Sequence, residues 1–323
     1  MEMNQLRRLR EAFAACTRGA TPVGRVMCEV LGGAAPSDRA TPSPAVAELF
    51  RQFYRTISAE APDARLFLSA LHHLALCGEA PDLVALFPSC GGTADLTALA
   101  EALEPAVAAG RESLLDYMLS HQVRPWLPER AGLLARGARA VADTFGGSIS
   151  LVEFGGVCGL NLLLDEAADL PPVAGRRGLD PAPLFPAHPG DRLLLESFLW
   201  PDETERLARL RHLAASPAAA ALDLRQGDPA ADLLPLLAEA YDAMAPGNTL
   251  VIMDAFAWPT LSDPERQQVT WQIQHLAGHL QPYKPLAWLQ LEPNALGTAA
   301  ELRLHTFGWS DPEDRTVRRV DLT

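Results

Sequence analysis

The stretch from residue 149 to 165 constrains the fold of this chain more than any other part. It reads ISLVEFGGVCGLNLLLD, an apolar run that ends at Glu153, then a glycine-rich turn and a second apolar run. This order predicts a β-strand, a sharp turn and the start of a helix, the opening of a nucleotide-binding βαβ unit. Gly155 allows the chain to turn off the strand, while Gly156 and Gly159 let the backbone approach a ligand closely.

The chain beyond this stretch continues the same alternation. The apolar runs predict strands at 148–153, 173–179, 220–225, 249–254, 285–291 and 302–307. Helices are expected between them, at 159–167, 202–214, 230–244 and 263–278. Strands that alternate with helices predict an α/β fold with a mostly parallel sheet and right-handed crossovers. The ligand site of such a sheet lies beyond the carboxyl ends of its strands.

Residues 1 to about 140 have a different pattern, in which apolar residues recur at helical spacing. After Ser43 and Pro44, for example, Val46, Leu49 and Phe53 fall on one face of an expected helix, with proline well placed in its first turn. No strong strand signal occurs before residue 145. The composition changes near 140–147 without a flexible linker, so we predict a helical part, 1–140, packed against an α/β part, 141–323.

Composition narrows the possible partners. The formal net charge is −13 and no dense basic patch occurs, so nucleic acid is not an expected partner. No leader sequence and no run of 18 apolar residues is visible, which predicts neither export nor a membrane span. The five cysteines are scattered, as in reduced cytoplasmic proteins. The single lysine, Lys284, is far from the glycine turn, which excludes a P-loop there. Among the possible partners, a small-molecule ligand is therefore the one we expect.

Acidic residues lie at the ends of four expected strands, at Glu153, Asp180, Asp228 and Asp254. Asp180 lies about twenty residues past the glycine turn, where a ribose-binding acid is expected. Asp228, after Gly227, could accept a hydrogen bond from an adenine amine. Each acid also has a plain structural interpretation: Asp180 precedes a proline as turn residues often do, and Asp228 could cap the following helix.

Five segments carry a resemblance to a known family. They are residues 71–78, 87–92, 153–162, 200–207 and 227–235, and the block WPDETERL at 200–207 is the most specific. In this order they look like an uncharacterised bacterial family, classed as a domain of unknown function, that is similar to class I S-adenosylmethionine (AdoMet) methyltransferases. The resemblance implies a Rossmann-like methyltransferase domain at 141–323 and an N-terminal all-helical cap domain at 1–140.

The resemblance also implies roles for individual residues. Glu153, Gly155 and Gly159 would hold the methionine part of AdoMet, Asp180 the ribose and Asp228 the adenine. The remaining expected binding residues are Phe154, Gly156, Asn161, Gly227, Asp254 and Phe256. Two departures from the family lie near the expected reactive end. Residues 123–129, VRPWLPE, replace a polar Gln-Thr-Asn-Glu segment, and Asp254 replaces a common histidine.

The reaction depends on what surrounds the sulfonium of AdoMet. Aromatic faces stabilise a desolvated cation by about 2 kcal/mol each at best. Five aromatic residues are candidates for such a cage: Trp126, Phe154, Trp200, Phe256 and Trp258. The Asn/Asp-Pro-Pro-Tyr tetrad of amino methyltransferases is absent, so no bound acceptor is indicated. We therefore favour attack of the AdoMet amine on its own γ-carbon, giving azetidine-2-carboxylate and 5'-methylthioadenosine.

The azetidine-2-carboxylate synthases are similar in plan, with a methyltransferase-like domain and a helical cap. In this hypothesis Asp254 or Asn161 holds or deprotonates the ammonium, and Trp126 completes the catalytic set. Conventional methyl transfer to a small molecule stays open, as does a non-catalytic AdoMet or nucleoside-binding protein. The sequence leaves the acceptor and the oligomeric state undetermined.

Two other chemistries are weaker. Residues 156–159, GVCG, resemble a nucleophile elbow with cysteine, but Leu160 stands where its second glycine is required. His275 and His279 are four residues apart, yet no glutamate follows His275 as in the zinc motif H-E-x-x-H. We therefore expect no metal.

Overall fold

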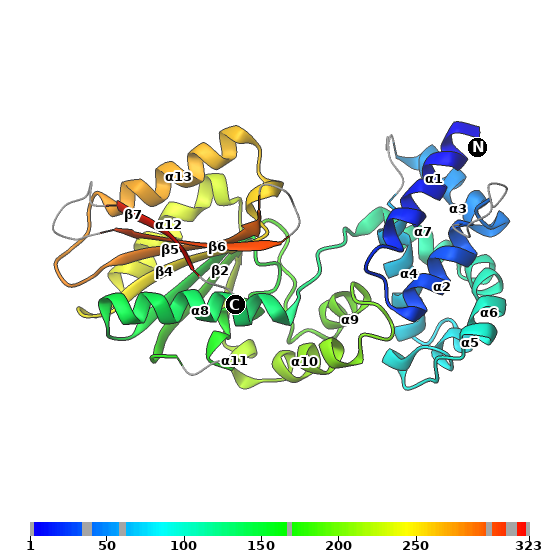
Figure 1. Ribbon diagram of the computed structural model, residues 1–323, viewed down its shortest axis with the longest axis horizontal. Helices are drawn as coiled ribbons and strands as arrows, with labels where there is room; N and C mark the ends of the chain where they lie inside the picture. The colour runs from blue at the N-terminus through cyan, green and yellow to red at the C-terminus, as the bar shows by residue number, and fades with distance from the viewer. Residues whose placement is uncertain are drawn as a thin grey trace. The chain divides into compact units, whose positions relative to one another are not determined.

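The structure is a computed structural model that describes residues 3–33, 41–57, 63–166, 170–294, 299–307 and 315–320. The chain divides into two compact units. One comprises Met1–Pro125 together with Pro189–Leu210, and the other comprises Trp126–His188 together with Arg211–Thr323. The first is helical and the second contains the sheet, and each is described by itself (Figure 1).

The helical unit is formed by short helices around an aromatic core. Its N-terminal helices are α1 (Met3–Cys16), α2 (Pro22–Gly32), α3 (Pro44–Thr56), α4 (Ala64–Leu76), α5 (Pro81–Val84), η1 (Pro88–Cys90), α6 (Leu96–Ala109) and α7 (Arg111–Ser120). As expected, α3 begins at the Ser43 cap and buries Phe50. The ring of Phe50 lies 6.5 Å from Phe13 and 5.7 Å from Phe67, so these buried rings join α1, α3 and α4.

The segment 189–210 joins this unit from a distant part of the sequence and contains the WPDETERL block. It carries α9 (Pro189–Ser197) and most of α10 (Thr204–Ala214). The carboxylate of Asp202 accepts hydrogen bonds from the Thr21 hydroxyl and from the Val23 amide at the start of α2. The Trp200 ring lies against Gly24, where a Cβ atom would be 2.5 Å from the ring. The block therefore has a structural role in attaching this segment to α2.

The observed division falls at different residues from the expected boundary between 140 and 141. Helix α8 (Pro128–Phe145) belongs to the unit that contains the sheet. The segment 189–210, expected within the α/β part, belongs to the helical unit. Both differences arise from tertiary packing, which a change of composition along the chain does not reveal.

The second unit is built on a seven-stranded sheet of order β3-β2-β1-β4-β5-β6-β7. The strands are β1 (Ile149–Phe154), β2 (Val173–Asp180), β3 (Asp223–Gln226), β4 (Thr249–Ala255), β5 (Leu286–Pro293), β6 (Ala300–Phe307) and β7 (Arg315–Val320). The strands from β3 to β5 are parallel, and β6 and β7 run antiparallel to their neighbours. The predicted α/β class with a mostly parallel sheet is confirmed, although β7 was not expected.

Helices cover both faces of this sheet. Helix α8 lies on one face, and α12 (Pro229–Asp242) and α13 (Asp263–Ala277) lie on the other (Figure 1). All residues of β1 and β4 are buried, as expected for parallel strands covered on both sides. The short helix α11 (Pro217–Ala220) precedes β3. Among the described helices, none is both long and apolar enough to cross a membrane.

Over the described residues 159–166, the helix expected at 159–167 is not present. Instead two short 3-10 helices, η2 (Leu160–Leu162) and η3 (Leu164–Glu166), follow the glycine turn. The backbone of Gly159 has a φ of +68°, a left-handed conformation that does not begin an α-helix. The leucines here pack as core residues without helical periodicity.

Candidate functional site

The predicted site residues of the sheet lie at the carboxyl ends of its central strands. Glu153 in β1 pairs in register with Gly178 of β2 and with Met253 of β4. Asp180 is the last residue of β2, and Asp254 is the next-to-last residue of β4. Because these strands are parallel, their acidic residues meet at one edge of the sheet, where ligands of open α/β sheets bind.

In the turn after β1, the backbone of Gly156 lies directly against the Glu153 carboxyl group. A Cβ atom on Gly156 would lie 2.1 Å from Glu153 Cδ, so only glycine fits there. Gly155 has a φ of +68°, and a Cβ there would lie 2.5 Å from the Cβ of Ala257. The turn expected at Gly155 is thus present, and Gly156 leaves room for the Glu153 carboxyl group.

At the same edge of the sheet, two residues other than glycine have a left-handed backbone conformation. Val157 after β1 has a φ of 61°, and Phe256 after β4 has a φ of 60°. Each such conformation costs about 1–3 kcal/mol and persists only where the surroundings enforce it. Strain of this kind concentrates at ligand sites, which makes this edge the leading candidate in the described part of the molecule.

Three predicted residues form a buried hydrogen-bonded chain beside this turn. The Trp126 indole Nε1 donates to Asn161 Oδ1 at 2.9 Å, and Asn161 Nδ2 donates to Glu153 Oε1 at 2.7 Å. All three side chains are buried, although they come from the segment before α8, from η2 and from β1. The amide of Asn161 is therefore fixed in orientation and holds one oxygen of the Glu153 carboxyl group.

The second oxygen of this carboxyl group, Glu153 Oε2, is buried and has no hydrogen-bond partner among the described residues. Burial raises the pKa of Glu153 to about 7; the hydrogen bond from Asn161 opposes this rise, Asp180 adds to it and Arg130 opposes it. A carboxyl group with this pKa can take up or release a proton near neutral pH. The site thus holds one buried carboxyl oxygen without a partner among the described residues, next to the backbone of Gly156.

Asp180 ties the glycine turn to the end of β2. Its two carboxylate oxygens accept hydrogen bonds from the amides of Val157 and Ala182, each at 2.9 Å. The Asp180 carbonyl accepts another from Gly227 at 3.0 Å. These contacts match the turn interpretation of Asp180, and a ribose would have to use the remaining lone pairs of the carboxylate.

Asp228 lies at the amino end of α12 and is exposed. Its carboxylate accepts a hydrogen bond from the Ala230 amide at 2.9 Å, and its own amide donates to Asp232 at 2.8 Å. Asp228 therefore caps α12, which is the plain interpretation of its sequence position. An adenine contact would be an additional role.

Asp254 is fully buried and belongs to a different cluster. Its Oδ2 accepts a hydrogen bond from Trp288 Nε1 at 2.8 Å, and its Oδ1, like Glu292 Oε2, is buried without a hydrogen-bond partner among the described residues. Burial raises the pKa of both carboxyl groups, and the neighbouring Glu292 raises that of Asp254 further. Both groups therefore favour the protonated form more than an ordinary carboxyl group does.

The structure separates Asp254 from the other predicted catalytic residues. Side chains alternate between the faces of a strand, so Asp254 lies on the face that packs against α12 and α13. Glu153 shares the opposite face with Leu151, against α8. Within the described residues, no hydrogen bond or ion pair joins Asp254 to Asn161 or Trp126. The expected single catalytic set is therefore divided between the two faces.

Two residues at this edge of the sheet were not predicted from the sequence. Glu292 follows the expected strand 285–291, so the strand-end pattern used for Asp254 would have found it. Its Oε1 accepts a hydrogen bond from the Trp258 amide at 3.1 Å. Arg130 in α8 gave no signal, yet its charge acts on both Glu153 and Glu292 and its guanidinium lies 4.5 Å from the Phe256 ring.

Four of the five candidate cage aromatics belong to the unit that contains the sheet, and these four are not assembled in one place. Phe154 is fully buried in the core beneath α12 and α13. Trp200 lies in the helical unit under the Arg65 guanidinium, 3.7 Å from its ring. Trp258 packs edge-on against Trp288 at 5.5 Å. Only Trp126 and Phe256 remain near the Glu153 cluster, through Asn161 and Arg130 respectively.

The geometry does not support a cysteine nucleophile at Cys158 or a metal site at His275 and His279. Cys158 is fully buried, unlike an exposed nucleophile. The rings of His275, in the last turn of α13, and of His279, just after that helix, lie 4.8 Å apart. However, no group of three or more potential metal ligands occurs in the described part of the chain.

Comparison with known protein families identifies one described as an uncharacterized protein conserved in bacteria (DUF2332), whose model matches residues 7–169 and 166–322. The matched ranges include residues of both structural units. No curated protein matches the chain.

Proposed function

The chain belongs to the bacterial family DUF2332, and we propose that it is an AdoMet-using enzyme that cleaves a carbon–sulfur bond of the sulfonium. The observation that carries this proposal is the unpartnered Glu153 Oε2, buried over the bare backbone of Gly156 at the end of β1. A buried acceptor in such a position suits the ammonium of a bound ligand, since an unsatisfied polar atom is otherwise costly.

The order of the parallel strands supports a Rossmann-like class for the second unit. The order 3-2-1-4-5 is that of dinucleotide-binding folds, in which the ligand lies where the strand order reverses beside β1. The glycine turn after β1 occupies this position. The two antiparallel strands β6 and β7 depart from the all-parallel arrangement, but they lie on the opposite side of β4 from the turn.

The common edge suggests how AdoMet would bind. The methionine ammonium would donate to Glu153 Oε2 above the glycine turn. Asp180 at the end of β2 would accept from the ribose, and the amino end of α12, with Gly227 and Asp228, would lie near the adenine. This assignment follows the order of the strand ends β1, β2 and β3 across the sheet.

The favoured reaction is intramolecular cyclisation to azetidine-2-carboxylate. The ammonium first gives a proton to Glu153, whose pKa of about 7 suits a general base at neutral pH. The free amine then attacks the γ-carbon; the new N–C bond forms as the C–S bond breaks, and the electron pair leaves with sulfur as 5'-methylthioadenosine. Asn161 and Trp126 are positioning residues, because an amide and an indole do not accept the proton.

The test is to incubate the purified full-length chain with AdoMet alone and to analyse the products by mass spectrometry. We expect 5'-methylthioadenosine and azetidine-2-carboxylate in equal amounts, above an enzyme-free sample. If S-adenosylhomocysteine forms instead, and only when a small-molecule acceptor is added, the reaction is methyl transfer and not cyclisation. AdoMet binding without turnover would indicate a non-catalytic binding protein, and absence of binding would refute the whole proposal.

A further inference from the structure

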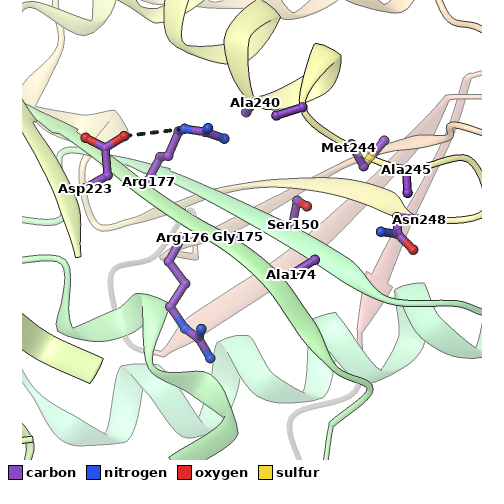
Figure 2. A pocket seen from close by; sticks show the side chains of 11 residues that line it. Ser150, Ala174, Gly175, Arg176, Arg177, Asp223, Ala240, Met244, Ala245 and Asn248 are labelled. Carbon is purple, nitrogen blue, oxygen red and sulfur yellow. Dashed lines mark ion pairs between the residues drawn. The ribbon is translucent and has the colours of Figure 1, made fainter. Parts of the chain in front are cut away.

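A pocket opens at the opposite end of the strands from the Glu153 edge. It has a volume of about 290 Å³ and lies between β1, β2 and the carboxyl end of α12 (Figure 2). Its walls include Ser150 near the start of β1 and Asn248 just before β4, whereas Glu153 lies near the end of β1. The pocket is therefore distinct from the edge proposed to bind AdoMet.

An irregularity in the sheet helps to create this space. Ile149 pairs with Val173 but Ser150 pairs with Gly175, so Ala174 is an extra residue in β2. β-bulges of this kind are frequent beside functional sites. Gly175 has no side chain to fill the pocket, and a Cβ there would still lie 3.7 Å from the Ser150 hydroxyl. The small residues Ala240 and Ala245 leave further room on the α12 side.

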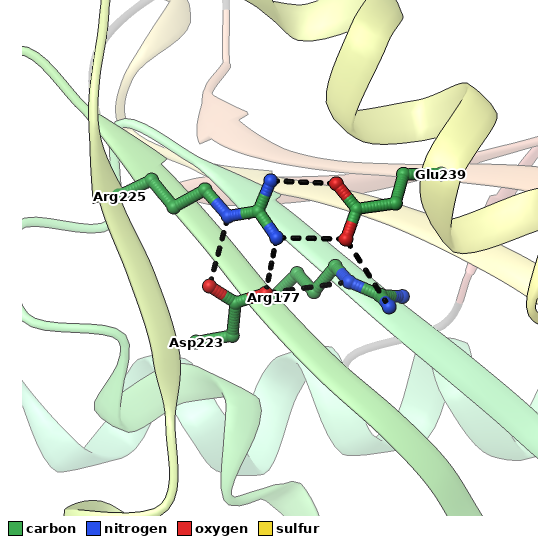
Figure 3. Close-up of polar contacts among 4 residues, drawn as sticks. All are labelled: Arg177, Asp223, Arg225 and Glu239. Atoms are coloured by element: carbon green, nitrogen blue, oxygen red, sulfur yellow. Dashed lines mark hydrogen bonds and ion pairs between the residues drawn. The ribbon is translucent and has the colours of Figure 1, made fainter.

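Arg177 supplies positive charge to the pocket. Its Nε lies 3.4 Å from an Asp223 oxygen, and its Nη2 lies 3.7 Å from Glu239 (Figure 3). The remaining nitrogen, Nη1, has no hydrogen-bond or ion-pair partner among the described residues. In the same described set, the Ser150 hydroxyl and the Asn248 side-chain amide also make no hydrogen bond. Three polar groups with free hydrogen-bonding capacity thus line one cavity.

The carboxyl end of α12 forms the opposite wall of the pocket. Helix α12 ends at Asp242, and Ala243, Met244 and Ala245 continue along the pocket. The carboxyl end of a helix carries a partial negative charge and presents carbonyl oxygens, which favour a cation. A ligand that spans the pocket would therefore meet donors at Arg177 and Ser150, and acceptors near Asn248 and the end of α12.

We propose that this pocket binds a small zwitterion of the amino acid class. The ligand carboxylate contacts Arg177 Nη1 and the Ser150 hydroxyl, and its ammonium faces Asn248 Oδ1 and the carboxyl end of α12. The volume of about 290 Å³ is at the lower end of small-molecule sites, which suits a ligand of this size. This site does not depend on the proposed AdoMet chemistry.

The experiment measures binding to the full-length chain by saturation-transfer NMR and titration calorimetry. The probes are the twenty protein amino acids, added singly, with propionate and ethylamine as analogues of alanine that lack one charged group. We expect at least one amino acid to bind, and each single-charge analogue to bind at least about tenfold more weakly, as loss of a charge-assisted contact implies. The proposal is wrong if none of the amino acids binds, or if propionate matches alanine when alanine binds.

Binding to variants of the pocket residues tests whether the ligand lies in this pocket. Arg177→Gln should weaken binding at least about tenfold. The matched control is Arg225→Gln, because Arg225 contacts the same carboxylates, Asp223 and Glu239, without lining the pocket (Figure 3). It should leave the affinity unchanged. Gly175→Leu, which fills the cavity, should abolish binding without removing a charge. Equal weakening by both arginine variants, or full binding by Gly175→Leu, would overturn the proposal.

Discussion

Two buried acidic clusters at the same edge of the sheet differ in what each carboxyl group can do. On the α8 face, Glu153 is held by one amide and keeps an oxygen without a partner among the described residues. On the α13 face, Asp254 Oδ2 accepts a hydrogen bond from Trp288, while Asp254 Oδ1 and Glu292 Oε2 likewise have no hydrogen-bond partner among the described residues. Burial raises the pKa of all three groups. The difference is that Glu153 is held by a neutral amide, whereas Asp254 lies beside a second carboxyl group that raises its pKa.

The largest expected effect tests this assignment through turnover. Glu153→Gln keeps the size of the side chain but removes the base, and should lower turnover by about 10²–10⁴-fold. Asp254→Asn is the matched control, because its amide still accepts from Trp288 and can donate to Glu292. It should retain most of the turnover, measured as 5'-methylthioadenosine formed from AdoMet per folded molecule.

A larger loss of turnover in Asp254→Asn than in Glu153→Gln would reverse the roles of the two acidic clusters. If Asp254→Asn loses as much turnover as Glu153→Gln, the pair on the α13 face takes part in the chemistry, as the sequence alone led us to expect. Normal turnover by Glu153→Gln would instead leave Glu153 with a purely structural role. AdoMet affinity, measured separately, distinguishes lost binding from lost chemistry in both variants.

The second effect is a dependence of stability on pH. The folded-state pKa of Glu153 is raised from 4.5 to about 7, so the folded protein holds a proton that the unfolded chain releases in this range. The stabilisation is complete below pH 4.5 and is lost as the pH rises to about 7. Its size is about 3.5 kcal/mol, from 1.4 kcal/mol per pKa unit.

Urea unfolding between pH 4.5 and 8 measures this dependence. Glu153→Gln should flatten part of the decline, because the neutral amide does not titrate. The Asp254–Glu292 pair has pKa shifts in the same direction and should account for a remaining decline that Asp254→Asn reduces. An unchanged slope in Glu153→Gln would mean that Glu153 titrates at its ordinary pKa in the folded protein.

Part of this site could be predicted from the sequence because it depends on local geometry. The apolar run, Glu153 and the glycine turn specify a strand end with exposed backbone, and these residues occur where they were expected. Asp180 and Asp254 were likewise placed correctly at strand ends. The face of the sheet to which each acid points follows from strand alternation, but only once the strand limits and the covering helices are known.

Other features depend on contacts between distant segments and gave no sequence signal. Arg130 approaches Glu153 because α8 packs across the sheet, and the segment 189–210 joins the helical unit through contacts such as that of Asp202 with α2. The leucines after Gly159 resembled a helix, but the left-handed Gly159 led to 3-10 turns instead. In each case tertiary packing outweighed the local pattern.

The smallest of the three effects compares the two indole donors. Trp288→Phe removes the donor to Asp254 and leaves a buried oxygen without its partner, which should lower the free energy of unfolding by about 1–3 kcal/mol. Trp126→Phe removes the equivalent donor to Asn161 and should cost a similar amount. The variants should differ in turnover: Asn161 orients Glu153, so only Trp126→Phe should lower turnover per folded molecule. Equal turnover in both variants would show that the orientation of Asn161 does not depend on Trp126, because Glu153 alone would then suffice to hold the amide.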